Sequence, residues 1–195
     1  KLSEESVALV NQKYHDLKHQ IAILRTTATE EEKTAYLDQM EKEIKCYEAQ
    51  NKTGNRILDT ILTAKTIQCQ NHGISLTCVA DGKELDFLQP MDISALFGNA
   101  LDNAIESVKK IDDPQKRLIH VSVSRQKNFL RIKVENCYEG KLEFENGMPK
   151  TTKQDKRFHG YGMKSIRKIV EKYNGSVTVN AKDGWFELRI LMVIG

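Results

Sequence analysis

A heptad pattern near the amino-terminal end most constrains what this chain can fold into. Apolar residues recur at alternating steps of three and four, at Val7, Val10, Tyr14, Leu17, Ile21 and Leu24. This spacing is typical of a helix that packs along one seam against other helices. Thr29 and Glu32 then match a capping box, which predicts the start of a second helix with an apolar stripe that continues, with interruptions, to Leu62.

Two helices with a short connection form an αα-hairpin, and two helices cannot enclose a core by themselves. We therefore expect the hairpin of residues 1–66 to pair with a second copy as a four-helix bundle, so that the protein is a homodimer. The alternative is that the hairpin packs on the remainder of its own chain.

Composition excludes several classes of protein. With 29% charged and 39% hydrophobic residues, the chain is neither disordered, nor collagenous, nor membrane-spanning. A net charge of +3 is too small to predict a nucleic-acid partner. Four cysteines (Cys46, Cys69, Cys78 and Cys137) show no metal-binding spacing, which favours buried thiols in a reducing compartment. The chain opens inside a helical pattern without a start methionine, so we expect it to be a fragment of a longer protein.

Residues 67–195 carry a mixed pattern. The pattern predicts strands over residues 74–79, 120–125, 129–135, 176–181 and 185–194, and helices over residues 92–110 and 162–174. We expect Asp92 to be the N-cap of the first of these helices, Gly175 to end the second, and Asp183-Gly184 to form a type I′ turn. This order predicts an α+β two-layer sandwich with helices on one face of a mainly antiparallel sheet.

The helix over residues 92–110 carries a polar stripe opposite its apolar face. Asn99, Asn103 and Glu106 follow one another at i, i+4 and i+7 and therefore lie on one side. Asparagine is a poor helix former, so two on one stripe call for a reason beyond solvation. Their carboxamide oxygens can bind Mg²⁺ while the ion keeps several waters. The alternative is an ordinary solvated helix face.

A basic, glycine-containing segment precedes the helix over residues 162–174. Residues 150–157 contain three lysines and one arginine against a single acid, and Gly160-Tyr161-Gly162 follows at the helix start. Glycines at a helix N-terminus let backbone N–H groups approach a phosphate. The segment matches neither a Walker loop nor a dinucleotide fingerprint, and an ordinary basic loop is the alternative.

Together these segments resemble a known family. Residues 99–106 (NALDNAIE) resemble the N-box of the GHKL ATPases, and residues 160–171 (GYGMKSIRKIVE) resemble their second glycine box. Residues 14–19 (YHDLKH) look like the phosphoacceptor box of sensor histidine kinases. The likeness is closest to the peptide-sensing, quorum-sensor-like branch, whose second-helix pattern also resembles Asn55, Leu58, Asp59 and Lys65.

The resemblance implies a division of labour between two domains. Residues 1–66 are expected to be the dimerisation and phosphotransfer hairpin, and residues 67–195 the catalytic ATP-binding domain of GHKL type. His15 is then the residue that is phosphorylated, and Asp16 orients its ring and stabilises the charge that develops on it. Independently, His15 lies just off the heptad seam, where a second domain can reach it.

For the ATP site, the resemblance implies that Asn103 coordinates Mg²⁺ and that Asn99 is a second polar contact to the metal and phosphates. Residues 138–159 look like the ATP lid. The resemblance also implies contacts to ATP from three basic lid residues and from the glycine box. These residues are Lys153, Lys156, Arg157, Gly160, Tyr161, Gly162 and Met163.

The sequence departs from the general kinase pattern at the adenine-binding box. The usual DxGxG is absent, and Val134-Glu135-Asn136 stands in its place. An Asn136 side-chain oxygen can accept the same hydrogen bond from adenine. A second departure is His19, where many histidine kinases carry Thr or Asn.

The resemblance thus implies an ATP-dependent histidine autokinase, the cytoplasmic fragment of a membrane-anchored bacterial sensor. ATP and Mg²⁺ are its expected cofactors, and an aspartate on a response regulator receiver domain is the expected acceptor. Membrane contact is expected only through an N-terminal sensor that this chain lacks. Alternatives are a catalytically degenerate GHKL domain that serves as a dimeric scaffold, and a GHKL serine kinase, which would lack the hairpin. His15 and His19, spaced i, i+4, also permit a zinc site, although no third ligand is evident.

Overall fold

The computed structural model describes residues 22, 24–26, 29–38, 52–140, 144–145, 148–149 and 159–194. For residues 144–145, 148–149 and 159–160 it describes the backbone alone. The chain divides into two compact units, Lys1–Cys46 and Tyr47–Gly195. Each unit is considered by itself.

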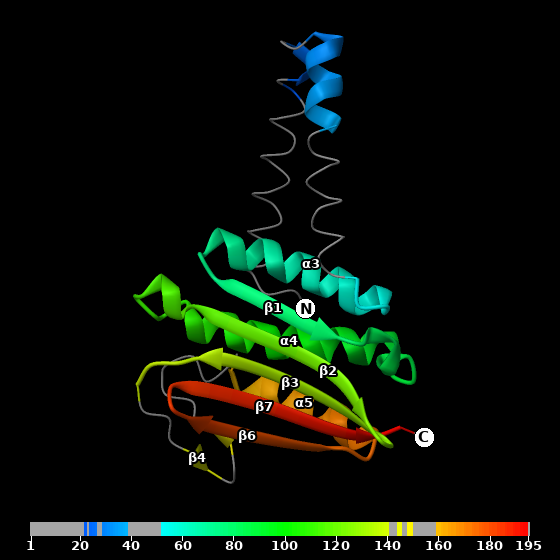
Figure 1. The fold of residues 1–195 in the computed structure, drawn as a ribbon, viewed down its shortest axis with the longest axis vertical. Helices are drawn as coiled ribbons and strands as arrows, with labels where there is room; N and C mark the ends of the chain where they lie inside the picture. Colours follow the sequence, from blue (N-terminus) through cyan, green and yellow to red (C-terminus); the bar gives the residue numbers. More distant parts are fainter. Residues whose placement is uncertain are drawn as a thin grey trace. The chain divides into compact units, whose positions relative to one another are not determined.

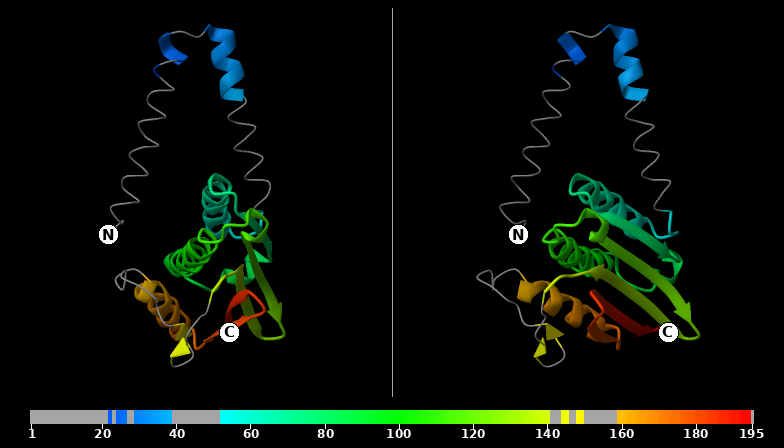
Figure 2. Two further views of the ribbon diagram at one scale, coloured as in Figure 1. Left: turned by 90° about the vertical axis from the view of Figure 1, so that its left-hand side faces the viewer. Right: turned by 60° about the vertical axis from the view of Figure 1, so that its left-hand side comes forward.

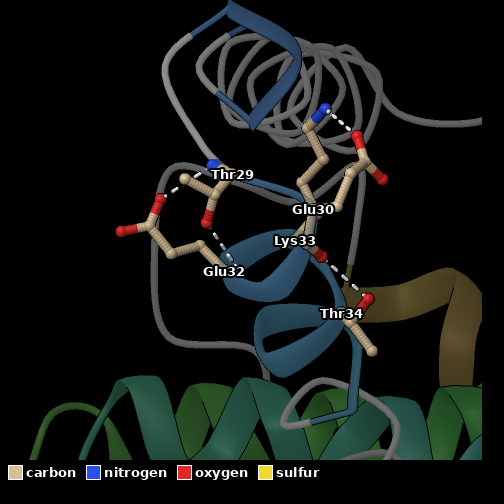
Figure 3. A network of polar contacts seen from close by, with 5 residues as sticks. All are labelled: Thr29, Glu30, Glu32, Lys33 and Thr34. Carbon is tan, nitrogen blue, oxygen red and sulfur yellow. Dashed lines mark hydrogen bonds and ion pairs between the residues drawn. The ribbon is translucent and has the colours of Figure 1, made fainter.

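The first unit contains the predicted capping box. The Thr29 N–H donates to Glu32 Oε2 at 2.9 Å, and the Glu32 N–H donates to Thr29 Oγ1 at 3.3 Å (Figure 3). Residues 30–38 follow as a helix, so the predicted helix start is confirmed. Most of the heptad seam, together with His15 and Asp16, lies outside the described residues.

The second unit is built on a five-stranded mixed sheet with the order β1-β2-β3-β7-β6 (Figure 1). Its strands are β1 (Ser75–Ala80), β2 (Leu118–Gln126), β3 (Phe129–Cys137), β6 (Ser176–Lys182) and β7 (Trp185–Val193). Only the β1–β2 pairing is parallel, which confirms a mainly antiparallel sheet. Asp183 and Gly184 join β6 to β7 with φ values of 54° and 77°, as the type I′ prediction requires.

Three helices cover one face of this sheet: α3 (Arg56–Asn71), α4 (Pro90–Val108) and α5 (His159–Lys172) (Figure 2). The core lies between the two layers. The apolar face of α4 packs over alternate residues of the central strands, among them Val121, Leu130, Ile132 and Val134. Shorter elements are η1 (Gly82–Leu85), η2 (Pro114–Lys116), and the ribbon of β4 (Phe144–Glu145) and β5 (Met148–Pro149).

Helix α3 occupies residues that we expected at the end of the hairpin. Gly54 has a left-handed backbone conformation, with φ of 95°. The Asn55 side chain, which follows it, accepts from the N–H groups of Ile57 and Leu58 and so caps α3. Leu58 and Leu62 are fully buried in the core of the second unit. These two leucines therefore pack in the core beside the sheet, and the predicted boundary after residue 66 falls inside α3.

Three predicted helix ends are corrected. Helix α4 begins at Pro90 with Gln89 as N-cap, because proline suits the first helical position, and Asp92 instead lies in the first turn. Helix α5 begins at His159, three residues before the predicted start, so Gly160 and Gly162 lie in its first turn. At its other end the left-handed residue is Asn174, with φ of 53°, just before the predicted Gly175.

Candidate functional site

The polar stripe on α4 faces the start of α5 at Gly162. Asn99 and Asn103 are half-buried, whereas Asp102 and Glu106 are exposed. A Cβ built on Gly162 would lie 3.5 Å from Oδ1 of Asn99 and 3.5 Å from Oδ1 of Asn103. The fold therefore joins the two segments that carry the family resemblance, although about sixty residues separate them.

This junction has the polarity of an anion and cation site. The first four N–H groups of a helix have no partner within it, and Gly162, the residue beside the two carboxamides, is the fourth residue of α5. Asn99 Nδ2 donates to the Ala95 carbonyl at 2.7 Å, so its Oδ1 is the atom turned toward Gly162. Two neutral oxygen donors and a row of backbone N–H groups suit a phosphate chain with its Mg²⁺.

Asn136 supplies a second polar position on the helix-covered face. It follows Leu130, Ile132 and Val134 on the inward-facing side of β3 and is only 2% exposed. Its Nδ2 donates to the Cys137 carbonyl at 2.8 Å, and no described residue donates to its Oδ1. This oxygen is therefore an acceptor that a ligand or water can use. The exocyclic amino group of adenine is such a donor.

Other predicted residues are only partly described. The Met163 side chain is partly buried and packs against the hydrophobic core. The Tyr161 side chain is 71% exposed. Lys153, Lys156 and Arg157 lie outside the described residues, and Gly160 is described by its backbone alone.

Asp102 lies next to the stripe but is held by another helix. Its carboxylate forms an ion pair with the Lys65 ammonium of α3, which also donates to Gln68 Oε1 at 3.2 Å. Asp102 is thus bound to α3, and the carboxamides of Asn99 and Asn103 are the polar groups of α4 placed beside Gly162.

At the far end of the α4–α5 contact lie polar residues whose meeting the sequence did not predict. Asp92 accepts hydrogen bonds from Lys172 and Tyr173, about eighty residues away in the chain. These two hydrogen bonds hold the pKa of the Asp92 carboxyl below its usual value. No local spacing could have joined these residues, because the contact depends on how the two helices pack.

The zinc alternative finds no support in the part of the chain that the structure describes. No group of three His, Cys, Asp or Glu side chains able to hold a metal occurs there. His120 is engaged otherwise, since its ring stacks on Trp185 at 5.3 Å and contacts the Thr77 hydroxyl. His15 and His19 are not described. Within the described ranges there is also no helix long and apolar enough to span a bilayer.

Comparison with known proteins agrees with this architecture. Residues 88–193 match the family model of the GHKL domain, which is more than half of the chain. A probable C4-dicarboxylate sensor kinase of Halalkalibacterium halodurans is 23% identical over 189 residues, covering 91% of this chain and 35% of that protein. The chain thus spans about a third of the length of this relative.

Solved histidine kinases share the fold. The nucleotide-free catalytic domain of the histidine kinase ThkA has a TM-score of 0.54 and 16% identity, covering 71% of this chain and 90% of that one. The histidine kinase AdeS of Acinetobacter baumannii has a TM-score of 0.52 and 12% identity, covering 100% of both chains. The peptide-sensing branch stays a prediction. The family match over residues 88–193, together with a mixed sheet that three helices cover on one face, shows that this chain belongs to the GHKL domain family.

Proposed function

We propose that this chain is the catalytic portion of an ATP-dependent protein histidine autokinase. The observation that carries the proposal is the meeting of Asn99 and Asn103 with Gly162 at the start of α5. The Asn136 carboxamide on the helix-covered side of the sheet adds a position for the base. The sensor-kinase relative supports the assignment of a kinase within the GHKL family.

The described residues divide the binding of Mg-ATP between them. Asn136 Oδ1 accepts from the adenine amino group, and the N–H groups that open α5 donate to the phosphates. Asn103, with Asn99 beside it, would hold Mg²⁺ through carboxamide oxygen, and the ion would supply positive charge to the phosphates. Lys153, Lys156 and Arg157 of the lid add positive charge from the basic segment.

The phosphoryl transfer itself involves the hairpin. A ring nitrogen of His15 attacks the γ-phosphorus, an N–P bond forms, and the bond from the γ-phosphorus to the bridging oxygen of ADP breaks. Asp16 orients the ring and stabilises the positive charge that develops on it. The phosphoryl group then passes to an aspartate on a separate response regulator. Because the transition state is loose, positioning and charge neutralisation carry most of the catalysis.

The proposed assembly is a homodimer through the first unit, residues 1–46 of the predicted hairpin, in a membrane-anchored bacterial sensor. Leu37, on the predicted apolar stripe, is 60% exposed in the single chain, which supports a partner for that helix. Light scattering tests the dimer, and a monomeric mass would contradict it.

Incubation with γ-labelled ATP and Mg²⁺ tests the activity. We expect label on the wild-type chain, no label on His15→Ala, and retained label on the matched control His19→Ala. Label that is labile in acid and stable in base identifies phosphohistidine and excludes a serine kinase. Nucleotide binding without any label would instead favour the dimeric scaffold.

A further inference from the structure

Helices α4 and α5 lie close to each other near both ends of their shared interface. Gly162 near the start of α5 meets Asn99 and Asn103, and Lys172 at its end meets Asp92. Rising numbers along α5 thus match falling numbers along α4, so the two helices are antiparallel. The proposed phosphate position is at one end of the interface, and a polar cluster is at the other.

We call the cluster formed by Gln89, Asp92, Lys172 and Tyr173 the clasp. Asp92 Oδ2 accepts from the Tyr173 hydroxyl at 2.5 Å and from Lys172 Nζ at 2.8 Å. The Tyr173 oxygen in turn accepts from the Gln89 N–H at 2.9 Å, and Lys172 Nζ also donates to Gln89 Oε1 at 3.0 Å. Each of the four residues has at least two hydrogen-bonding links to the others, which makes the clasp a closed network.

The clasp also joins α5 to the rest of the fold. The Tyr173 ring meets the Phe87 ring edge-on, with 6.0 Å between the ring centroids, and Phe87 lies in the segment that leads into α4. Two residues further on, a Cβ on Gly175 would lie 2.5 Å from the Leu191 carbonyl oxygen, so the chain presses directly against β7. The carboxyl end of α5 is therefore held against both α4 and the sheet.

From these contacts we infer that Asp92 and Tyr173 are positioning residues for the phosphates of the bound nucleotide. The inference rests on the proposed function. Lys172, the last residue of α5, lies ten residues beyond Gly162, about 15 Å along the helix axis. A tilt of α5 at the clasp therefore shifts Gly162 relative to Asn99 and Asn103. The clasp thereby sets the distance between Gly162 and the two carboxamides at the opposite end of the interface.

A positioning role differs measurably from a purely structural one. The adenine position at Asn136 lies on β3, whereas the phosphate position depends on α5. Loss of the clasp should therefore weaken binding of a triphosphate while leaving binding of the nucleoside alone. General destabilisation would weaken both ligands together or neither.

The test uses the full chain and two clasp variants, Tyr173→Phe and Asp92→Ala. A matched control is Asp59→Ala, because Asp59 is also a first-turn carboxylate that accepts two hydrogen bonds, both from Thr53 of the segment before α3. Titrations followed by NMR give the Kd of Mg-ATP and of adenosine for each protein. For the clasp variants we expect the Kd of Mg-ATP to rise about tenfold and that of adenosine to stay within about twofold. We expect neither Kd to change in the control.

The outcomes separate the two proposals. If the wild-type chain binds no Mg-ATP, the proposed function is overturned, and the positioning role with it. If the wild type binds Mg-ATP and Tyr173→Phe binds it equally well, the positioning role alone is overturned. Parallel loss of ATP and adenosine binding also overturns it. Tyr173→Phe keeps the ring on Phe87, so it decides the question even if Asp92→Ala does not fold.

Discussion

Gly162 of α5 lies against the Asn103 carboxamide of α4, so closely that a Cβ on the glycine would be 3.5 Å from Asn103 Oδ1. That distance is ordinary van der Waals contact, so the fold itself accepts a methyl group at this position. Under the proposed function, the glycine instead leaves room for the phosphates beside the carboxamides.

Replacement Gly162→Ala should separate stability from nucleotide binding. Alanine favours a helix over glycine by up to about 1 kcal/mol, so the thermal midpoint should stay level or rise. The methyl group occupies space beside the Asn99 and Asn103 carboxamides that the phosphates would need. We therefore expect the Kd of Mg-ATP to rise about tenfold. Calorimetric titration and thermal melts measure both quantities. The matched control is Gly98→Ala, because a Cβ on Gly98 meets nothing within 4 Å. Unchanged ATP affinity in Gly162→Ala would show that the phosphates do not bind beside Gly162.

Replacement Asn136→Asp should weaken ATP binding, although aspartate is the usual residue of the family at the adenine position. The Asn136 amide donates to the Cys137 carbonyl at 2.8 Å, and an ionised carboxylate cannot donate. Two acceptors would then face each other in a buried place, which costs about 1–3 kcal/mol. Calorimetric titrations at neutral pH, with wild type as control, check this. Equal affinity of the two proteins would show that the bond to Cys137 does not matter.

Replacement Gly82→Ala should destabilise the second unit. A Cβ there would lie 2.7 Å from the Asn55 backbone nitrogen and would also collide with the Thr53 hydroxyl. The Gly82 N–H donates to the Thr53 carbonyl at 2.7 Å, so the glycine holds the segment before α3 against η1. Overpacking of this kind costs about 1–3 kcal/mol. Urea denaturation measures the loss, with Gly98→Ala as control, and an unchanged free energy of unfolding would contradict the packing described here.

The thiols of Cys69 and Cys78 should be unreactive in the folded protein. Burial raises the pKa of each from 9.0 to about 11. At pH 8 this leaves about one thiol in a thousand ionised, against about one in ten for an unperturbed thiol. Alkylation by iodoacetamide, mapped by mass spectrometry, should therefore be about a hundredfold slower at Cys69 in native protein than in urea. Similar rates in the two states would contradict the burial.

The same shift predicts how stability depends on pH. A pKa raised by folding contributes stability that is present below pH 9, the value for the unfolded thiol, and is lost as the pH rises toward about 11. Wild type should therefore lose more stability between these limits than Cys69→Ala, in which that thiol is absent. Urea midpoints across this range measure the difference. A difference that stays constant with pH would show that Cys69 does not titrate in this way.

Local patterns were sufficient for several features of this protein. Thr29 and Glu32 predict a helix start, and Asp183-Gly184 predicts a tight hairpin, because each feature depends on residues within a few positions of one another. The alternation of β2 and β3 and the apolar face of α4 were enough to predict an α+β sandwich. Residue identity also placed Asn99, Asn103 and Gly162 in one family pattern before their proximity was known.

Only the tertiary structure decided where several of these patterns are used. Leu58 and Leu62 have the same spacing whether they face another helix or a sheet. Asn55, directly after the left-handed Gly54, caps α3, and this helix places both leucines against the sheet. Asp92 has the residue type of an N-cap, but its carboxylate bonds to Tyr173, because the packing of α5 brings that hydroxyl within 2.5 Å. Periodicity reports which face of an element is apolar, whereas the partner of that face is settled by contacts between residues distant in the sequence.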